Sequence, residues 1–390
     1  MRMSLKRLFY TFAEIPFMLG MYLVRRPRKF RGSFHQNRKW YRVDMPKHST
    51  IDGSKYYFYM KKGESDNLLI NFMGGGVAWN KTSLAKPGTI FSMMLGKEAY
   101  YTSRLSDMIM PVLEGVLSLN DPNNPFDTWN VVNIPYATGD FHTGNSEVVV
   151  TDSKGRVKHY HLKGEVNLNA IMKVVKRQFP KVSKLVISGQ SAGAFGCVAQ
   201  GDNVASKYPQ AERVVIIADG AQIPYPKWQT TAHKLWKTSP RLYECIGNDG
   251  DLIGDWFVRL SKELNATFLH INSPQDDMFV KFSSKMNGGK FGITPKFRSV
   301  YVTSLKKTVY RLTDQISKYR PFIAEFERDE KQDTTAHTAM WYDHRIHAKT
   351  PAGITFAEWI QKAIDGEEIS PVGLDLLDEY TKKYVIKQGV

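Results

Sequence analysis

Short apolar runs recur along the chain after about residue 45. Each run is rich in β-branched residues and is followed by a glycine-rich or polar turn. Runs of this length and composition are typical of buried strands in a parallel sheet. We expect such strands at residues 67–73, 129–135, 184–189, 213–219 and 266–272.

Helix-like segments separate these runs. Residues 169–179 have apolar positions at helical spacing, residues 192–208 are rich in small side chains, and residues 256–264 have an apolar stripe. Strands that alternate with helices predict an α/β fold with a doubly wound, mostly parallel sheet. The alternating segment 148–162 predicts a β-hairpin.

The beginning of the chain has a different character. Seventeen residues, 8–24, are apolar apart from a few positions such as Glu14 and Pro16, and arginines flank them on both sides. Because a transmembrane helix needs about 20 apolar residues, we expect residues 1–31 to bind an anionic membrane surface through a basic, hydrophobic helix. An uncleaved signal anchor and an amphipathic helix that packs on its own body are the alternatives.

The positive charge is concentrated in the same region. The chain of 390 residues has a formal net charge of +16, of which residues 1–48 carry +10. The small charge of the remainder argues against a nucleic-acid partner. Two cysteines, Cys197 and Cys245, are too few for a disulfide scaffold. We therefore expect a membrane-associating segment at 1–44, a catalytic domain at 45–390, and a location on the cytoplasmic side of a membrane.

The most informative motif follows the strand predicted at 184–189. Gly189-Gln190-Ser191-Ala192-Gly193 has the pattern G-x-S-x-G, between a strand and a helix rich in small residues. In this context the serine sits on a sharp turn with its hydroxyl exposed above the sheet. The motif predicts that Ser191 is a nucleophile, and the alternative is a structural serine in a glycine-rich turn.

A serine nucleophile needs a base, and the base needs an orienting carboxylate. In α/β-hydrolases the acid and then the histidine follow the serine along the chain. Asp276 and Asp277 follow the strand predicted at 266–272. Downstream of them the histidines are His337, His344 and His347. We predict Asp276 or Asp277 as the acid and His337 as the base, with the other two histidines open as the base.

A second set of backbone donors is predicted at the glycine loop, residues 74–77. Its bare N–H groups suit an oxyanion hole together with the N–H of Ala192. A phosphate-binding role is the alternative. No zinc motif is present, so we expect no metal and no cofactor. The candidates for substrate binding are Gly75, Trp79, Trp129, Asp140, His142 and Asn145.

Together these segments resemble the pectin acetylesterase family, which includes the Notum esterases. Seven segments resemble the family's motifs in the same order, over about residues 65–365. They are GGGVAWN (74–80), FDTWNVVNIPYATGDFHTGN (126–145), HLKG (161–164), SGQSAGAFG (188–196), IADGAQI (217–223), INSPQDD (271–277) and AHT (336–338).

The resemblance implies an α/β-hydrolase-like serine esterase and places the family's triad on Ser191, Asp276 and His337. It also places the oxyanion hole at the N–H groups of Gly76, Val77 and Ala192. Two departures concern the acyl pocket, because Val77 stands where the family has tryptophan and Gln275 where it has tyrosine.

The function expected from the motifs and the resemblance is removal of O-acetyl or other short acyl groups from a polysaccharide. A membrane-associated lipid or acyl-protein esterase or thioesterase is one alternative. A non-catalytic binding protein on a hydrolase scaffold is another. The sequence leaves the substrate and the oligomeric state open.

Overall fold

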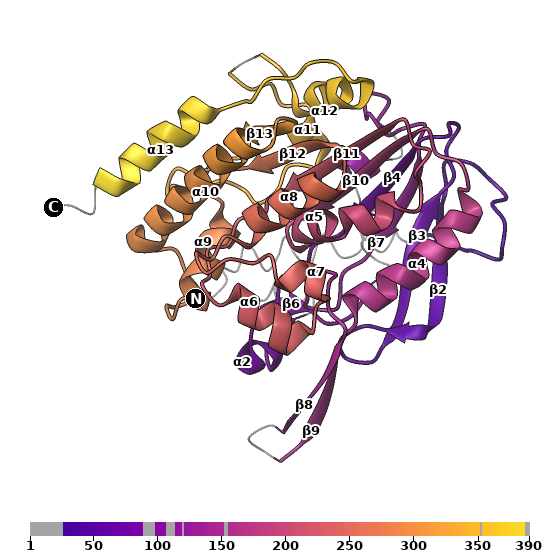
Figure 1. Ribbon diagram of the computed structural model, residues 1–390, viewed down its shortest axis with the longest axis horizontal. Helices are drawn as coiled ribbons and strands as arrows, with labels where there is room; N and C mark the ends of the chain where they lie inside the picture. Colours follow the sequence, from indigo (N-terminus) through magenta and orange to yellow (C-terminus); the bar gives the residue numbers. More distant parts are fainter. Residues whose placement is uncertain are drawn as a thin grey trace, which may run out of the picture.

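A computed structural model describes residues 26–88, 98–106, 114–118, 121–151, 155–351 and 353–386. Its centre is a nine-stranded sheet (Figure 1). Across the sheet the strands are β1 (Arg28–Lys29), β2 (Trp40–Ser49), β3 (Lys55–Lys61), β7 (Asn130–Ile134), β4 (Leu68–Phe72), β10 (Lys184–Gln190), β11 (Arg213–Asp219), β12 (Thr267–Asn272) and β13 (Tyr319–Ile323).

The predicted α/β fold with a mostly parallel sheet is confirmed. From β7 to β13 all neighbouring strands are parallel, whereas β3 is antiparallel to both β2 and β7. All five strands expected from apolar runs are present. In parallel strands the carboxyl ends lie at one edge of the sheet, which is where ligands bind in open α/β folds.

Helices cover both faces of the sheet. One face packs against α4 (Gly164–Gln178), α5 (Ala192–Ala205), α8 (Leu252–Glu263), α9 (Asp277–Met286), α10 (Pro295–Gln315) and α13 (Leu374–Ile386). The other face packs against η2 (Gly115–Leu117), α11 (Asp343–Ile346) and α12 (Phe356–Asp365). Shorter elements are α2 (Lys81–Leu84), β5 (Pro87–Gly88), β6 (Tyr101–Thr102), α6 (Trp228–Thr230), η3 (Thr231–Trp236) and α7 (Pro240–Tyr243).

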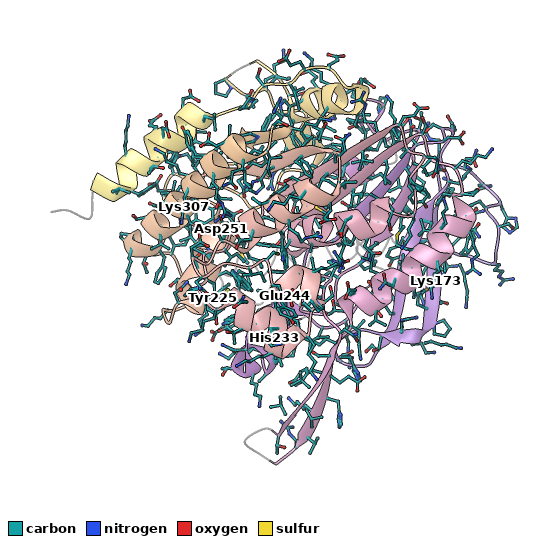
Figure 2. The ribbon with its side chains drawn as sticks, in the orientation of Figure 1. Lys173, Tyr225, His233, Glu244, Asp251 and Lys307 are labelled. Carbon is teal, nitrogen blue, oxygen red and sulfur yellow. The ribbon has the colours of Figure 1, made fainter. Side chains whose placement is uncertain are left out.

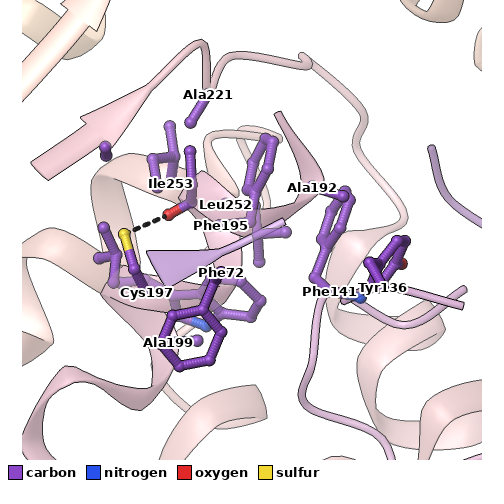
Figure 3. Packing of buried hydrophobic residues seen from close by; sticks show 14 of the residues in the cluster. Phe72, Tyr136, Phe141, Ala192, Phe195, Cys197, Ala199, Ala221, Leu252 and Ile253 are labelled. Atoms are coloured by element: carbon purple, nitrogen blue, oxygen red, sulfur yellow. Dashed lines mark hydrogen bonds between the residues drawn. The ribbon is translucent and has the colours of Figure 1, made fainter. Parts of the chain in front are cut away.

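The small residues of α5 allow this helix to lie close to the sheet. Its Phe195, Cys197 and Ala199 are buried, near Phe72 of β4 and Phe141 (Figure 3). The Cys197 thiol donates to the carbonyl of Ala194 at 3.2 Å. Burial raises its pKa well above the ordinary value, so Cys197 is a packed core thiol.

The predicted hairpin is confirmed as β8 (Ser146–Thr151) and β9 (Val157–Leu162), which are antiparallel. Figure 1 shows it projecting from the body of the molecule. Val149 and Val157 are exposed on it.

The predicted boundary at residue 44 falls inside a strand. Residues 40–49 form β2, which pairs with β3 and β1, and Phe30 packs against Tyr41. Residues 26–44 are therefore part of the folded body. The apolar stretch 8–24 lies outside the described residues, and among those that are described no helix is long and apolar enough to span a membrane.

Candidate active site

Ser191 lies on a sharp turn between β10 and α5. Its backbone has φ 56° and ψ −123°, in the left-handed region that a residue other than glycine rarely adopts. The Ser191 N–H donates to the carbonyl of Asp219 at 2.9 Å, which ties the turn to the end of β11. The serine is half-buried. This is the strand, turn and helix arrangement that G-x-S-x-G predicts.

Close backbone contacts explain the glycines around this serine. A Cβ on Gly189 would lie 2.1 Å from the carbonyl oxygen of Gly193, and a Cβ on Gly193 would lie 1.9 Å from the carbonyl oxygen of Phe72. Gly74 approaches the serine from the glycine loop, and its Cβ would lie 2.7 Å from Ser191 Cβ. Larger residues at these positions would push the turn and the glycine loop apart.

The acid and the histidine predicted for the triad are in contact. His337 Nδ1 donates to Asp276 Oδ2 at 2.6 Å. The other carboxylate oxygen, Oδ1, caps α9 by accepting from the N–H groups of Met278 at 3.0 Å and Phe279 at 2.9 Å. Asp276 is 1% exposed. Asp277 points elsewhere and forms an ion pair with Lys281.

The electrostatics of His337 reflect this contact. Burial by itself lowers the pKa of His337, but the charge of Asp276 and its hydrogen bond outweigh burial, so the pKa is raised. Because Asp276 accepts from Nδ1, the neutral ring carries its lone pair on Nε2. Nε2 has no hydrogen bond to any described residue, and neither has Ser191 Oγ.

The side chain of His337 lies beside the end of β11. Gly220 has φ +69°, and a Cβ there would lie 3.5 Å from His337 Cε1 and 3.1 Å from Thr338 Cγ2. The residue before it, Asp219, is the one whose carbonyl binds the Ser191 N–H. The serine is therefore bound by Asp219, and the histidine lies beside the next residue, Gly220.

The glycine loop differs in one respect from the prediction. The Val77 N–H donates to the carbonyl of Tyr100 at 2.8 Å, so it is already used and the prediction for Val77 was wrong. The cause is the bridge between Gly76 and Tyr101, which turns Val77 towards the neighbouring segment.

Other backbone donors near the serine are free. The N–H groups of Gly75, Gly76 and Ala192 have no acceptor among the described residues. Ala192 is the first residue of α5, where the helix dipole favours negative charge. A Cβ on Gly74 would lie 3.4 Å from the Ala192 nitrogen, so the glycine loop and this helix end adjoin each other.

Two predicted binding residues are instead buried in the body. Asp140 is 0% and His142 is 2% exposed. Asp140 accepts from the Thr138 hydroxyl and the backbone N–H groups of His142 and Gly164. Burial lowers the pKa of His142 to about 4, and its Nε2 lies 3.0 Å from the carbonyl oxygen of Met73. The His142 ring supports the segment that leads from β4 into the glycine loop, whereas Asp140 ties its own loop to the start of α4. The burial of both side chains argues against contact with substrate.

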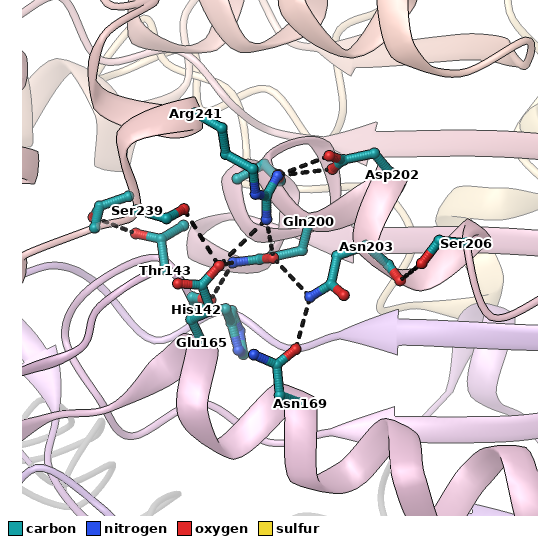
Figure 4. A network of polar contacts seen from close by, with 12 residues as sticks. His142, Thr143, Glu165, Asn169, Gln200, Asp202, Asn203, Ser206, Ser239 and Arg241 are labelled. Atoms are coloured by element: carbon teal, nitrogen blue, oxygen red, sulfur yellow. Dashed lines mark hydrogen bonds and ion pairs between the residues drawn. The ribbon is translucent and has the colours of Figure 1, made fainter.

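Figure 4 shows the surroundings of His142. Its carbonyl accepts from Gln200 at 3.2 Å, within a polar network that includes Glu165 and Arg241. This network lies between helices on one face of the sheet and is structural.

The predicted tryptophans are buried as well. Trp129 precedes β7, at the edge of the sheet opposite the serine, and packs against Phe126. Trp79 is 5% exposed and packs on Tyr100 and Phe282. The position of Trp129, a strand's length from the turn, is incompatible with contact to a substrate bound there.

The remaining predicted candidates occupy the surface or the loop itself. Asn145 is exposed at the base of the hairpin, and its N–H donates to the carbonyl of Trp236. Gly75 lies in the glycine loop and is half-buried. His344 pairs with Glu327, and His347 pairs with Asp121 at 2.5 Å. Neither of these histidines contacts Asp276.

Two residues that the sequence analysis did not single out hold the histidine loop (residues 335–340). Asp219 accepts from the N–H groups of Ala339 and Met340, both at 2.8 Å. Arg345 donates to the carbonyls of His337 and Thr338 at 3.1 and 2.8 Å. A carboxylate directly after a wholly apolar strand run was the sequence signal for Asp219.

A mostly parallel sheet with a serine at a strand-to-helix turn defines an α/β-hydrolase-like fold of the ester-hydrolysing class. The family model described as pectinacetylesterase matches residues 44–234. This match confirms the resemblance to that family inferred from the motifs, and the chain is an ester-hydrolysing enzyme.

A solved structure shares the fold. The Wnt deacylase Notum from Drosophila superposes with a TM-score of 0.56 and is 16% identical, and the match covers 85% of this chain and 97% of that chain. At this identity the likeness establishes the fold. No curated protein sequence matches the chain.

Proposed function

We propose that the chain is a serine carboxylesterase that removes O-acetyl or other short acyl groups, with a polysaccharide as the acylated substrate. The observation that carries the proposal is the hydrogen bond between His337 and Asp276 beside the strained turn of Ser191. Asp276 follows β12, and its partner His337 lies beside Gly220, next to the residue whose carbonyl accepts from the Ser191 N–H. The chain order serine, aspartate, histidine is that of an α/β-hydrolase triad.

In the proposed reaction Ser191 Oγ attacks the acyl carbonyl. His337 Nε2 takes the serine proton and then delivers it to the leaving alcohol oxygen. Asp276 keeps the Nδ1 proton in place and stabilises the imidazolium while it exists. Water, activated by the same histidine, then attacks the acyl-enzyme and releases the carboxylic acid.

The negative charge that develops on the acyl oxygen needs preorganised donors. The N–H groups of Gly75, Gly76 and Ala192 fit this role, because they belong to the glycine loop and the helix start that adjoin each other beside the serine, and they bind nothing else among the described residues. Loss of one donor of this kind typically costs about 10²–10³ in turnover.

Hydrolysis of p-nitrophenyl acetate tests the proposal. Ser191→Ala should reduce turnover to the background rate while the melting temperature changes little, because the hydroxyl is half-buried and has no hydrogen bond among the described residues. A fluorophosphonate should label the wild-type protein at Ser191 and should not label the variant. Full turnover in Ser191→Ala, or an unlabelled wild type, would refute a serine mechanism.

The acyl group is tested by a series of esters of increasing chain length. A sharp preference for acetyl esters, together with acetate release from acetylated glycans, supports polysaccharide deacetylation. A preference for chains of eight carbons or more contradicts the short-acyl proposal and favours a lipid or acyl-protein substrate. We further propose that residues 1–25 bring the enzyme to an anionic membrane surface, on the strength of their charge and apolar pattern.

A further inference from the structure

Asp219 forms hydrogen bonds with two segments of the proposed active site, the turn at Ser191 and the histidine loop. Its carbonyl accepts from the N–H of Ser191, and its Oδ2 accepts from the N–H groups of Ala339 and Met340. It is the last residue of β11 and is 1% exposed. A single residue thus binds both the turn that carries the nucleophile and the loop that carries the base.

We propose that Asp219 is a positioning residue that fixes His337 relative to Ser191, and that its second carboxyl oxygen shares a proton with the side-chain amide of Gln190. This inference rests on the triad proposed above and adds a fourth residue, Asp219, that positions the histidine.

The histidine loop is held from both sides. Arg345 donates to the carbonyls of His337 and Thr338, and Asp219 accepts from the two N–H groups that follow. Four consecutive residues therefore have one backbone group each bound to a buried charged side chain. Thr338 has φ 63°, and these bonds offset the cost of that left-handed conformation.

Two buried oxygens near this loop lack a donor. Among the residues that the structure describes, Asp219 Oδ1 and Gln190 Oε1 have no hydrogen-bond partner. Gln190 and Asp219 are register partners in the parallel strands β10 and β11, so their side chains point to the same face of the sheet. Both also contact Met340, which donates its N–H to Asp219 and lies with its sulfur 3.9 Å from Gln190 Nε2.

A proton shared between Asp219 Oδ1 and Gln190 Oε1 would give each of these oxygens a hydrogen-bond partner. Two acceptors without a donor are costly when buried, and a protonated carboxyl group supplies one donor. The amide of Gln190 cannot turn to supply it without losing its Nε2 bond to Asn71 Oδ1 at 2.7 Å.

The electrostatic environment favours the protonated form of Asp219. Burial, with a smaller contribution from the charge of Asp276, raises the pKa of Asp219 to about 6. The N–H groups of Met340 and Ala339 and the charge of His337 lower this pKa but do not outweigh burial. Because the folded pKa exceeds the ordinary value of 3.8, Asp219 stabilises the fold when protonated. That stabilisation is lost as the pH rises from about 4 to about 6.

Asp219→Asn and Asp219→Ala separate the two parts of the proposal, the positioning of His337 and the shared proton. The asparagine oxygen can still accept from Ala339 and Met340, and its NH₂ group supplies a permanent donor to Gln190. We expect Asp219→Asn to keep most of the wild-type kcat. Asp219→Ala frees the loop, and we expect kcat to fall about 10²-fold with KM for p-nitrophenyl acetate little changed, because His337 is displaced rather than the binding surface.

The shared proton has a signature in pH-dependent stability. The melting temperature of Asp219→Asn minus that of the wild type should increase between pH 4 and 6 and stay constant above. In a Gln190→Leu background this increase should become smaller, because the partner of the proton is gone. A difference that does not vary with pH would overturn the shared proton.

Asp251→Asn is a matched control (Figure 2). Asp251 is also buried, accepts the N–H of Gly254 and has a raised pKa because of burial, but it pairs with Arg311 in another part of the molecule. This control should lose stability and keep kcat. If Asp219→Ala keeps kcat while Ser191→Ala abolishes turnover, the positioning role is wrong and the triad stands. If Ser191→Ala is active, the proposed function itself fails.

Discussion

Replacing Asp276 with asparagine probes the geometry at the base most directly. The carboxylate has two separate tasks in the structure: Oδ1 caps α9 through the N–H groups of Met278 and Phe279, and Oδ2 accepts from His337. The asparagine oxygen can perform only one of these tasks. If it keeps the cap, its NH₂ group faces His337 Nδ1 and forces that nitrogen to accept.

The two capping hydrogen bonds determine how strongly the asparagine side chain prefers the orientation that keeps the cap. Turning the amide over would leave two backbone N–H groups without an acceptor, at about 1–3 kcal/mol each. The capped orientation should therefore prevail by about 30-fold or more. In that orientation the ring proton moves to Nε2, so His337 cannot accept the serine proton, and the negative charge beside the ring is lost. We expect kcat to fall by about 10⁴, as the corresponding change does in a serine protease.

The assay is turnover of p-nitrophenyl acetate together with thermal unfolding. Asp276→Asn should unfold close to the wild-type temperature, because the cap is retained. Asp276→Ala should be equally inactive but should lose about 0.5–2 kcal/mol of stability with the cap. If Asp276→Asn keeps more than about a tenth of the wild-type kcat, the reasoning about the tautomer is wrong and Asp276 is not the orienting acid.

Three further predictions concern the pH profile, the end of β11 and the beginning of the chain. The kcat/KM of the wild type should fall on the acid side with a midpoint above pH 6.5, because the base must be neutral and Asp276 raises the pKa of His337; a midpoint at or below 6.5 would contradict this. Gly220→Ala should lower kcat, because its Cβ would lie 3.1 Å from Thr338 Cγ2, whereas Gly288→Ala, which has φ +87° and open space around it, should lose similar stability and keep kcat. A protein that begins at residue 26 should leave vesicles that contain anionic lipid and keep its activity on a small ester, and binding equal to that of the full chain would refute the membrane role of residues 1–25.

Five strands of the parallel part of the sheet could be predicted because they are buried on both faces, whereas β13, which is also parallel, was not predicted. Their runs of apolar residues, as in 184–189 and 213–219, leave little choice of structure. The strands β2 and β3 were missed. Tyrosines and lysines interrupt their apolar pattern, and only the pairing of the two strands with the sheet buries them.

The residues of the proposed triad could be selected from the sequence because their chemistry restricts the choice. Three histidines follow Asp277, and only one of these three stands among small residues. The direction of a backbone N–H cannot be predicted in this way, which is why Val77 was assigned wrongly. Whether a polar side chain faces a substrate or the interior depends on tertiary packing, and Asp140 and His142 lie in the interior.

Asp219 illustrates what spacing alone does not reveal. It belongs to the segment 217–223 that resembles a family motif, yet its role depends on Ala339 and Met340, which are more than a hundred residues away in sequence. Such a residue becomes visible only when its hydrogen-bond partners are known.

Four neighbouring strands each deliver one part of the site. The glycine loop follows β4, the serine follows β10, Asp219 ends β11 and Asp276 follows β12. The proposed active site is complete only when all four strands are paired. A partly refolded chain in which any one of them is unpaired should therefore have no esterase activity. During renaturation, catalysis should therefore return together with protection of the amides in all four strands and not before it.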